Sequence, residues 1–76
     1  MKVYTYIITY PDGKIMSICG AVFESETAAT DALYNLFDLA YQFHWQEDKK
    51  FFEMISRGAS RKHMFNAYVL DFELAN

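Results

Sequence analysis

The sequence predicts an α+β fold of two layers, in which a three-stranded antiparallel sheet carries two helices on one face in the order β-β-α-α-β. Three observations support this prediction. An alternating N-terminal segment is followed by a turn motif, a helical repeat of apolar residues occupies the middle, and a second alternating segment lies near the C-terminus. We expect a single domain, 1–76, because 76 residues are too few to build two hydrophobic cores.

The first two strands are predicted to form a β-hairpin. Residues 2–10 alternate and are rich in Val, Ile, Thr and Tyr, and residues 14–23 form a similar run. Between them lies Pro11-Asp12-Gly13, in which proline presets the first turn position and glycine accepts a left-handed backbone. These features predict a hairpin with a glycine bulge.

A pairing of Tyr10 with Lys14 sets the expected register of this hairpin and places Ile8 opposite Met16. The face expected to meet the helices carries bulky side chains, namely Tyr4, Tyr6, Ile8, Met16, Ile18 and Val22. The other face is smaller and more polar but includes three apolar residues, Val3, Ile7 and Ile15. A half-apolar open face is a candidate contact surface, so the sequence leaves a homodimer as an alternative.

The first helix is predicted to run from Glu26 to about Trp45. Ser25 precedes it as an N-cap, and Glu26 complements the helix dipole in the first turn. Apolar residues recur at helical spacing as a buried stripe of Ala29, Leu33, Leu36, Phe37, Ala40 and Phe43. A longer helix would place Glu47 and Asp48 on the buried side, which is costly, so a break is predicted there.

A second, short helix is predicted after this break. Glu47 and Asp48 would form its acidic first turn, and Arg57-Gly58 would end it with a basic residue and a C′ glycine. Residues 59–63 are predicted to be a basic loop. The third strand is predicted over residues 64–73, with Tyr68, Leu70 and Phe72 pointing inward and Ala67, Asp71 and Glu73 pointing outward.

The composition favours a dense core and excludes several other classes of protein. Hydrophobic residues make up 53% of the chain and aromatic residues 18%, whereas the single cysteine, Cys19, cannot form an internal disulfide. The N-terminal segment lacks the unbroken apolar run of a signal peptide or membrane span, so we expect a cytoplasmic protein without a membrane partner. The net charge of −3 indicates neither a general nucleic-acid binder nor a DNA mimic.

The sequence offers no catalytic or cofactor motif. The two histidines, His44 and His63, are far apart and lie in no metal-binding spacing, so we expect no metal site. Cys19 lies in a predicted strand without a neighbouring base, which is typical of an apolar filler rather than a nucleophile. The glycines are scattered and form no phosphate-binding loop. We therefore expect no enzymatic activity and no cofactor.

An aromatic stripe on the predicted long helix is the best candidate for partner binding. Tyr34, Tyr41 and Trp45 flank the buried stripe, with Asp38 among them. Tyrosine and tryptophan are enriched in binding hot spots, so we expect these four residues to contact a protein partner. The alternative is that the second helix or the last strand covers them.

A basic segment provides a second candidate contact. Residues 44–63 carry two more basic than acidic side chains, although the whole chain is acidic. Arg57, Arg61 and Lys62 are the predicted contacts, because exposed basic side chains near a helix end suit phosphates. The alternative is a solvated loop that complements a helix dipole.

The size, mild acidity, expected cytoplasmic location and hairpin–helix–strand order resemble those of small phage-encoded anti-CRISPR proteins. This resemblance extends over the whole chain as a layout and includes no diagnostic motif. It implies a non-enzymatic inhibitor that binds a larger protein assembly, such as a nucleoprotein defence complex, in the host cytoplasm. The sequence leaves two alternatives, a nucleic-acid-binding module that uses residues 57–63 and a self-associating structural protein.

Overall fold

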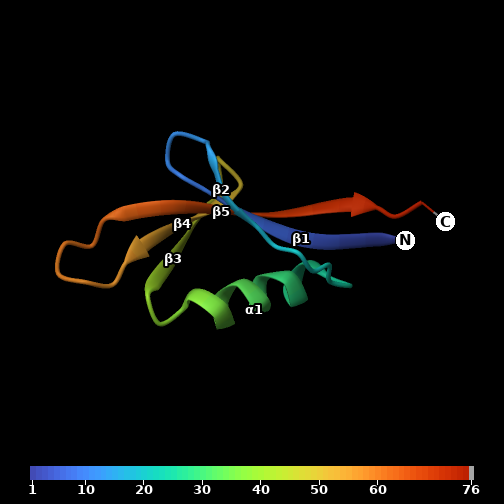
Figure 1. Cartoon of the computed structure of the whole chain (residues 1–76), viewed down its shortest axis with the longest axis horizontal. Helices are drawn as coiled ribbons and strands as arrows, with labels where there is room; N and C mark the ends of the chain where they lie inside the picture. Colours follow the sequence, from blue (N-terminus) through green and yellow to red (C-terminus); the bar gives the residue numbers. More distant parts are fainter. Residues whose placement is uncertain (76) are drawn as a thin grey trace.

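The computed structural model describes residues 1–75 and contains, within them, one five-stranded antiparallel sheet and one helix (Figure 1). The elements in chain order are β1 (Lys2–Thr9), β2 (Ile15–Ile18), α1 (Glu26–Phe37), β3 (Tyr41–Gln46), β4 (Phe51–Ser56) and β5 (His63–Glu73). The sheet order is β2-β1-β5-β4-β3, so the N-terminal and C-terminal strands pair at its centre. Helix α1 lies along one face of this sheet (Figure 1).

The predicted β-β-α-α-β arrangement is wrong, because the sheet has five strands rather than three and the described residues contain one helix rather than two. The error lies in the middle of the chain. Where the helical pattern predicted the end of a long helix and then a short one, the chain forms the β3–β4 hairpin. No helix among residues 1–75 is long and apolar enough to cross a membrane.

Helix α1 ends at Phe37 rather than near Trp45. The backbone N–H of Asp38 still donates to the carbonyl oxygen of Tyr34 at 2.8 Å, and residues 39–40 then turn the chain into β3. No glycine or proline marks this end, which is why the pattern of apolar residues predicted a longer helix. The shorter helix frees the following residues to join the sheet.

Strand β3 uses an aromatic pattern that also fits a helix. Tyr41, Phe43 and Trp45 are spaced by two residues, so in a strand they share one face, and here that face meets α1. Phe43 pairs with Met54, and Trp45 pairs with Phe52, in the β3–β4 register. Pairing with a second apolar strand covers the rings more completely than an exposed helical extension would.

The acidic residues that suggested a helix break lie at the tip of the β3–β4 hairpin. Glu47 and Asp48 are exposed there. Lys50 takes a left-handed backbone with φ of 60°, and its N–H donates to the carbonyl oxygen of Gln46 at 2.8 Å, which closes the turn. The predicted second helix is therefore a tight turn followed by β4.

The β1–β2 hairpin forms as predicted. Gly13 has φ of +94°, and its N–H donates to the carbonyl oxygen of Tyr10 at 2.9 Å. The N–H of Tyr10 donates to the carbonyl oxygen of Lys14 at 2.8 Å, which confirms the pairing of these two residues. The side chain of Asp12 also accepts from the N–H of Lys14 at 3.0 Å. The turn chemistry of this motif thus fixes the hairpin locally.

A β-bulge changes the register beyond the turn. Thr9 pairs with Ile15 but Ile8 pairs with Ser17, so Met16 is the extra residue and its predicted pairing with Ile8 is wrong. A shift of one residue moves side chains to the opposite face of the sheet. Ile18, predicted to face the helix, is therefore 63% exposed on the other face. The regular strand is also shorter than predicted, since it ends there.

The core lies between α1 and the helix-facing side chains of the sheet. Leu33 and Ala29 of the helix are fully buried, and the cluster below includes Tyr6, Ile8, Met54 and Ala67. The predicted orientation of the last strand is therefore wrong, because its pairing with β1 places Ala67 on the helix side and Leu70 and Phe72 on the opposite face. The N-cap prediction is confirmed, because the hydroxyl of Ser25 accepts from the N–H of Ala28 at 3.0 Å. Leu36, predicted in the buried stripe, is instead 67% exposed. The helix therefore buries a narrower stripe than its sequence predicted.

Candidate partner-binding site

The four residues of the predicted aromatic stripe do not share one surface. Tyr34 packs on Phe43 and Phe52, with ring centroids 4.7 and 5.7 Å apart, and Tyr41 packs on Phe65 at 5.7 Å. Burial raises the pKa of the Tyr34 phenol, because it disfavours the phenolate. These two tyrosines therefore pack at the edges of the core, and only part of each ring is accessible. The last strand covers Tyr41 through Phe65, as the alternative expected, but Tyr34 is covered by β3 and β4 rather than by a second helix.

Asp38 and Arg57 were predicted on separate contact surfaces, and the structure brings them together. The Arg57 Nη2 atom lies 3.1 Å from Asp38 Oδ1, and its Nε–H donates to the Asp38 carbonyl oxygen at 2.8 Å. Arg61 donates to the side-chain oxygen of Gln42. Arg57 and Arg61, two of the three predicted basic contacts, thus bond other residues of the same chain. The third, Lys62, is exposed. This weakens the case for a phosphate-binding loop.

Trp45 is the aromatic member of the stripe that is most exposed at the surface. It lies on edge strand β3 and is 46% exposed, with one part of its ring packed on Phe52 at a centroid distance of 4.9 Å. Its Nε1–H donates to the Glu47 carboxylate, which also accepts from Lys50 Nζ at 2.8 Å. The hydrogen bond from Lys50, followed by that from Trp45, lowers the pKa of Glu47. The indole ring is therefore held in position at the rim.

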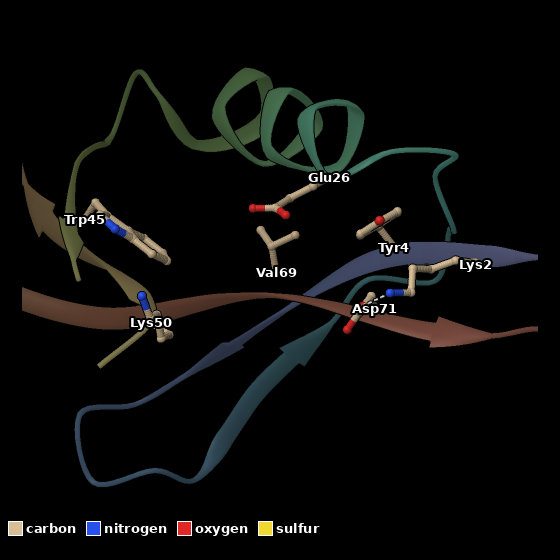
Figure 2. Close-up of a pocket in the computed structure, with 7 residues that line it drawn as sticks. All are labelled: Lys2, Tyr4, Glu26, Trp45, Lys50, Val69 and Asp71. Carbon is tan, nitrogen blue, oxygen red and sulfur yellow. Dashed lines mark ion pairs between the residues drawn. The ribbon is translucent and has the colours of Figure 1, made fainter. Parts of the chain in front are cut away.

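The other side of this ring borders an open pocket of about 480 Å³ on the helix side of the sheet (Figure 2). Segments far apart in the sequence form it, because β1 and β5 are neighbours in the sheet and the β3–β4 hairpin lies next to β5. Its lining consists of Lys2, Tyr4, Glu26, Trp45, Lys50, Val69 and Asp71. Figure 2 shows Val69 between Trp45 and Tyr4, with the Glu26 carboxylate directed over it.

The charges of the pocket are mostly paired. Lys2 Nζ lies 3.0 Å from Asp71 Oδ2, and the hydrogen bond between them raises the pKa of Lys2 and lowers that of Asp71. Lys50 is paired with Glu47 outside the pocket at 2.8 Å. Among residues 1–75, Glu26 forms neither an ion pair nor a side-chain hydrogen bond. The pocket therefore presents one carboxylate that is free to bind.

This arrangement has the elements of a site for a cationic side chain. Trp45 and Tyr4 provide aromatic rings, which attract cations through their faces, and Glu26 provides a negative charge between them. Sequence reasoning identified Trp45 as a contact, but it assigned Glu26 only to the helix dipole and Tyr4 only to the face that meets the helices. The missing signal is the pairing of β1 with β5, which no local pattern reveals.

The remaining candidate residues do not form a reactive group. Cys19 packs beside Tyr6, and burial followed by a hydrogen bond with this thiol raises the pKa of the phenol. On the opposite side of the sheet, His63 Nε2 lies 2.6 Å from Asn66 Oδ1, and its Nδ1 lies 3.9 Å from Glu53. Within the described part of the chain, no three His, Cys, Asp or Glu side chains are grouped so as to hold a metal ion.

Comparisons with known proteins do not assign a family to this chain. No family model, curated protein or solved structure matches it. The resemblance to anti-CRISPR proteins therefore stays a prediction.

Proposed function

We propose that this chain is a small, non-enzymatic interaction protein whose pocket receives a basic side chain of a protein partner. The observation that carries this proposal is the free Glu26 carboxylate between the rings of Trp45 and Tyr4. Arginine fits such a site best, because its guanidinium both stacks on aromatic faces and pairs with a carboxylate. Tryptophan and arginine are also the residues that dominate binding hot spots.

The net negative charge of the site favours binding of a cationic side chain. Lys2 and Lys50 lie at the pocket, but Asp71 and Glu47 pair with them at 3.0 and 2.8 Å. With Glu26 included, two lysines and three acids leave one net negative charge. A cation–π contact contributes about 0.5–1 kcal/mol at an exposed site, so the pocket alone would bind a single side chain weakly. A tight complex would need further contacts around it.

We propose that the partner is a larger assembly and that binding inhibits it, as the resemblance to anti-CRISPR proteins implies. Assemblies that hold nucleic acid present arginine and lysine side chains to the phosphates. A pocket for such a side chain would let this chain compete with nucleic acid without imitating its charge. Expression of the chain in cells with an active CRISPR defence tests this part, and unchanged interference with a targeted plasmid would count against it.

The pocket itself can be tested with the protein alone, because Trp45 is its single tryptophan and its fluorescence reports on the site. The probe is the capped peptide acetyl-Gly-Arg-Gly-amide, compared with the same peptide containing neutral citrulline. We expect a saturable change in Trp45 emission at about tens to hundreds of millimolar arginine peptide, because an exposed cation–π contact and an exposed ion pair each contribute about 1 kcal/mol or less, and little change with citrulline. Equal responses to the two peptides would exclude a cation site.

The matched variants are Glu26→Gln and Asp31→Asn, which remove one charge each from exposed positions of the same helix. Glu26→Gln should abolish the arginine response, whereas Asp31→Asn should preserve it, since Asp31 is not part of the pocket lining. Glu26 lies in the first helical turn, so its loss should also cost about 0.3–1 kcal/mol of stability. Circular dichroism would confirm that both variants are folded.

A further inference from the structure

The face of the sheet opposite α1 carries an apolar patch over four of its strands, whereas β3 contributes only polar residues to it, and no helix covers it within residues 1–75 (Figure 1). We call it the open face. The strand registers place a row of four apolar residues across four neighbouring strands of it, Ile18, Ile7, Tyr68 and Phe51. Three further apolar side chains of this face are substantially exposed, namely Ile15 at 58%, Leu70 at 42% and Phe72 at 40%.

We infer that a second copy of this chain packs on the open face, sheet against sheet, about a two-fold axis. Two sheets that pack face to face bury the alternate residues of their strands against each other. A two-fold interface brings the same patch of both copies together, so the patch must complement itself. A row of uncharged apolar side chains meets this requirement.

The charges of the open face argue against other occupants. Its ionisable side chains among the described strands are those of His44, Glu53 and His63. Glu53 is already engaged, because it accepts from Gln46 Nε2 at 3.1 Å and faces His63 at 3.9 Å. Two basic side chains from the turns also reach this face: Lys49 Nζ lies 6.0 Å from the Phe51 ring centroid, and Arg61 donates to Gln42. Two such cations are fewer than the row of phosphate contacts on which nucleic-acid binding depends, and the face has no row of charges for a charged peptide. The pocket lined by Trp45, Tyr4 and Glu26 lies on the other side of the sheet.

The area of the open face is sufficient for a stable dimer. Five strands spaced about 4.8 Å apart give a width of about 24 Å, and eight residues of β1 give a length of about 27 Å. Because β2 is only four residues long and β3 and β4 six, the actual strand lengths reduce the product of width and length to roughly 570 Å² for one copy and 1,100 Å² for two. That is slightly more than the minimum of about 1,000 Å² that a specific interface needs. The isolated chain also exposes 5141 Å², compared with about 4,800 Å² expected for a compact monomer of its mass.

Sedimentation velocity over a range of concentrations tests this inference. We expect the protein to sediment at about twice its monomer mass of 8.9 kDa at high concentration and to dissociate on dilution. The disrupting variant is Ile18→Lys with Leu70→Lys, which places two charges of each copy in the interface. It should raise the dissociation constant by about 100-fold or more, because buried unpaired charges are costly.

The matched control is Leu36→Lys with Leu39→Lys, which changes two exposed leucines on the helix side, 67% and 97% accessible. It should leave the dissociation constant unchanged. Ile18→Thr with Leu70→Thr provides a milder variant that suits a strand, in case the lysine variant does not fold. A wild-type monomer at high concentration, or a dimer that survives both open-face variants, would overturn the inference.

The arginine titration separates this result from the proposed function. Trp45 lies on the helix side, so the threonine variant should keep its fluorescence response to the arginine peptide even when it is monomeric. Loss of dimerisation with an intact pocket, and loss of the pocket with an intact dimer, are thus distinct outcomes.

Discussion

Arg57, at the end of β4, anchors the C-terminal end of α1 through Asp38. Its Nη2 atom lies 3.1 Å from Asp38 Oδ1, and its Nε–H donates to the Asp38 carbonyl oxygen at 2.8 Å. The carbonyl groups at a helix end have no partner within the helix, so this contact satisfies one of them and favours the negative end of the dipole. The contact joins the helix to the hairpin that the sequence did not predict.

Replacement of Arg57 by alanine should lower the free energy of unfolding by about 1 kcal/mol, because it removes an ion pair and a hydrogen bond to a backbone carbonyl. The value is small because both side chains are substantially exposed. Asp38→Asn should cost only about half as much, since the bond to the carbonyl remains. Urea unfolding followed by circular dichroism would measure both changes.

The control for this pair is Lys62→Ala. Lys62 uses its backbone N–H to bond the Ser56 hydroxyl at 3.0 Å, and alanine keeps that bond. Its stability should stay within about 0.5 kcal/mol of wild type. If Lys62→Ala lowered the free energy of unfolding as much as Arg57→Ala, the basic segment would stabilise the fold through its overall charge rather than through the contact between Arg57 and Asp38.

The core depends on Leu33, the largest fully buried side chain of α1, which packs on Ile8 and Met54. Leu33→Ala should destabilise the protein by about 3 kcal/mol through lost burial and a residual cavity. A domain of this length has a free energy of unfolding of roughly 4–11 kcal/mol, so this variant should be close to unfolding at elevated temperature. Thermal denaturation would measure the loss.

Leu36→Ala provides the matched change on the same helix, because Leu36 is 67% exposed. Its effect should be within about 0.5 kcal/mol. The sequence pattern predicted both leucines in the buried stripe. If Leu33→Ala and Leu36→Ala lowered the free energy of unfolding equally, both leucines would be buried, as the sequence pattern predicted, and Leu36 would not be exposed.

The sequence predicted the elements whose causes are local. Pro11-Asp12-Gly13 specifies its own turn through backbone preferences, and Ser25 caps the helix through a bond to a residue three positions away. Both predictions were correct for this reason. The bulge at Met16 was missed because its cause is the packing of the two strands rather than the turn residues.

The elements that sequence reasoning missed depend on distant partners. The spacing of Phe37, Tyr41 and Trp45 suits one face of a helix, but Tyr41 and Trp45 also alternate as in a strand. The strand is formed because β4 pairs with it and β5 pairs with β4, and these pairings are non-local. For the same reason Trp45 could be predicted as a contact, whereas its pocket partners Tyr4 and Glu26 could not.

Substitution of Gly13 should destabilise the protein more than substitution of Gly58. Its φ of +94° lies in a region that side chains disfavour, so Gly13→Ala should cost about 1 kcal/mol or more although nothing lies within 4 Å of the added carbon. Gly58 has no such φ and equally open surroundings, so Gly58→Ala should be neutral or slightly stabilising. Thermal unfolding of the two variants would compare them, and equal effects would contradict the argument from backbone conformation.

The fluorescence of Trp45 should report the protonation of Glu47, because the indole Nε1–H donates to this carboxylate. The hydrogen bonds from Lys50 and then from Trp45 lower the pKa of Glu47 below its ordinary value of 4.5. A carboxyl whose pKa is lower in the folded state stabilises the fold above its unfolded pKa, and this contribution disappears as the pH falls through the folded value. The emission of Trp45 should therefore change at a midpoint below 4.5.

Of the two hydrogen bonds to Glu47, the one from Lys50 lowers its pKa more. Lys50→Met removes that bond, so it should move this midpoint upward toward 4.5. Glu47→Gln should abolish this transition, since the carboxylate that accepts from the indole Nε1–H is then replaced by a neutral amide. Lys49→Met is the matched control, because Lys49 lies in the same turn without an ion pair to Glu47 among the described contacts. If the Lys50→Met midpoint equals that of wild type, the turn does not hold Trp45 through Glu47 and Lys50.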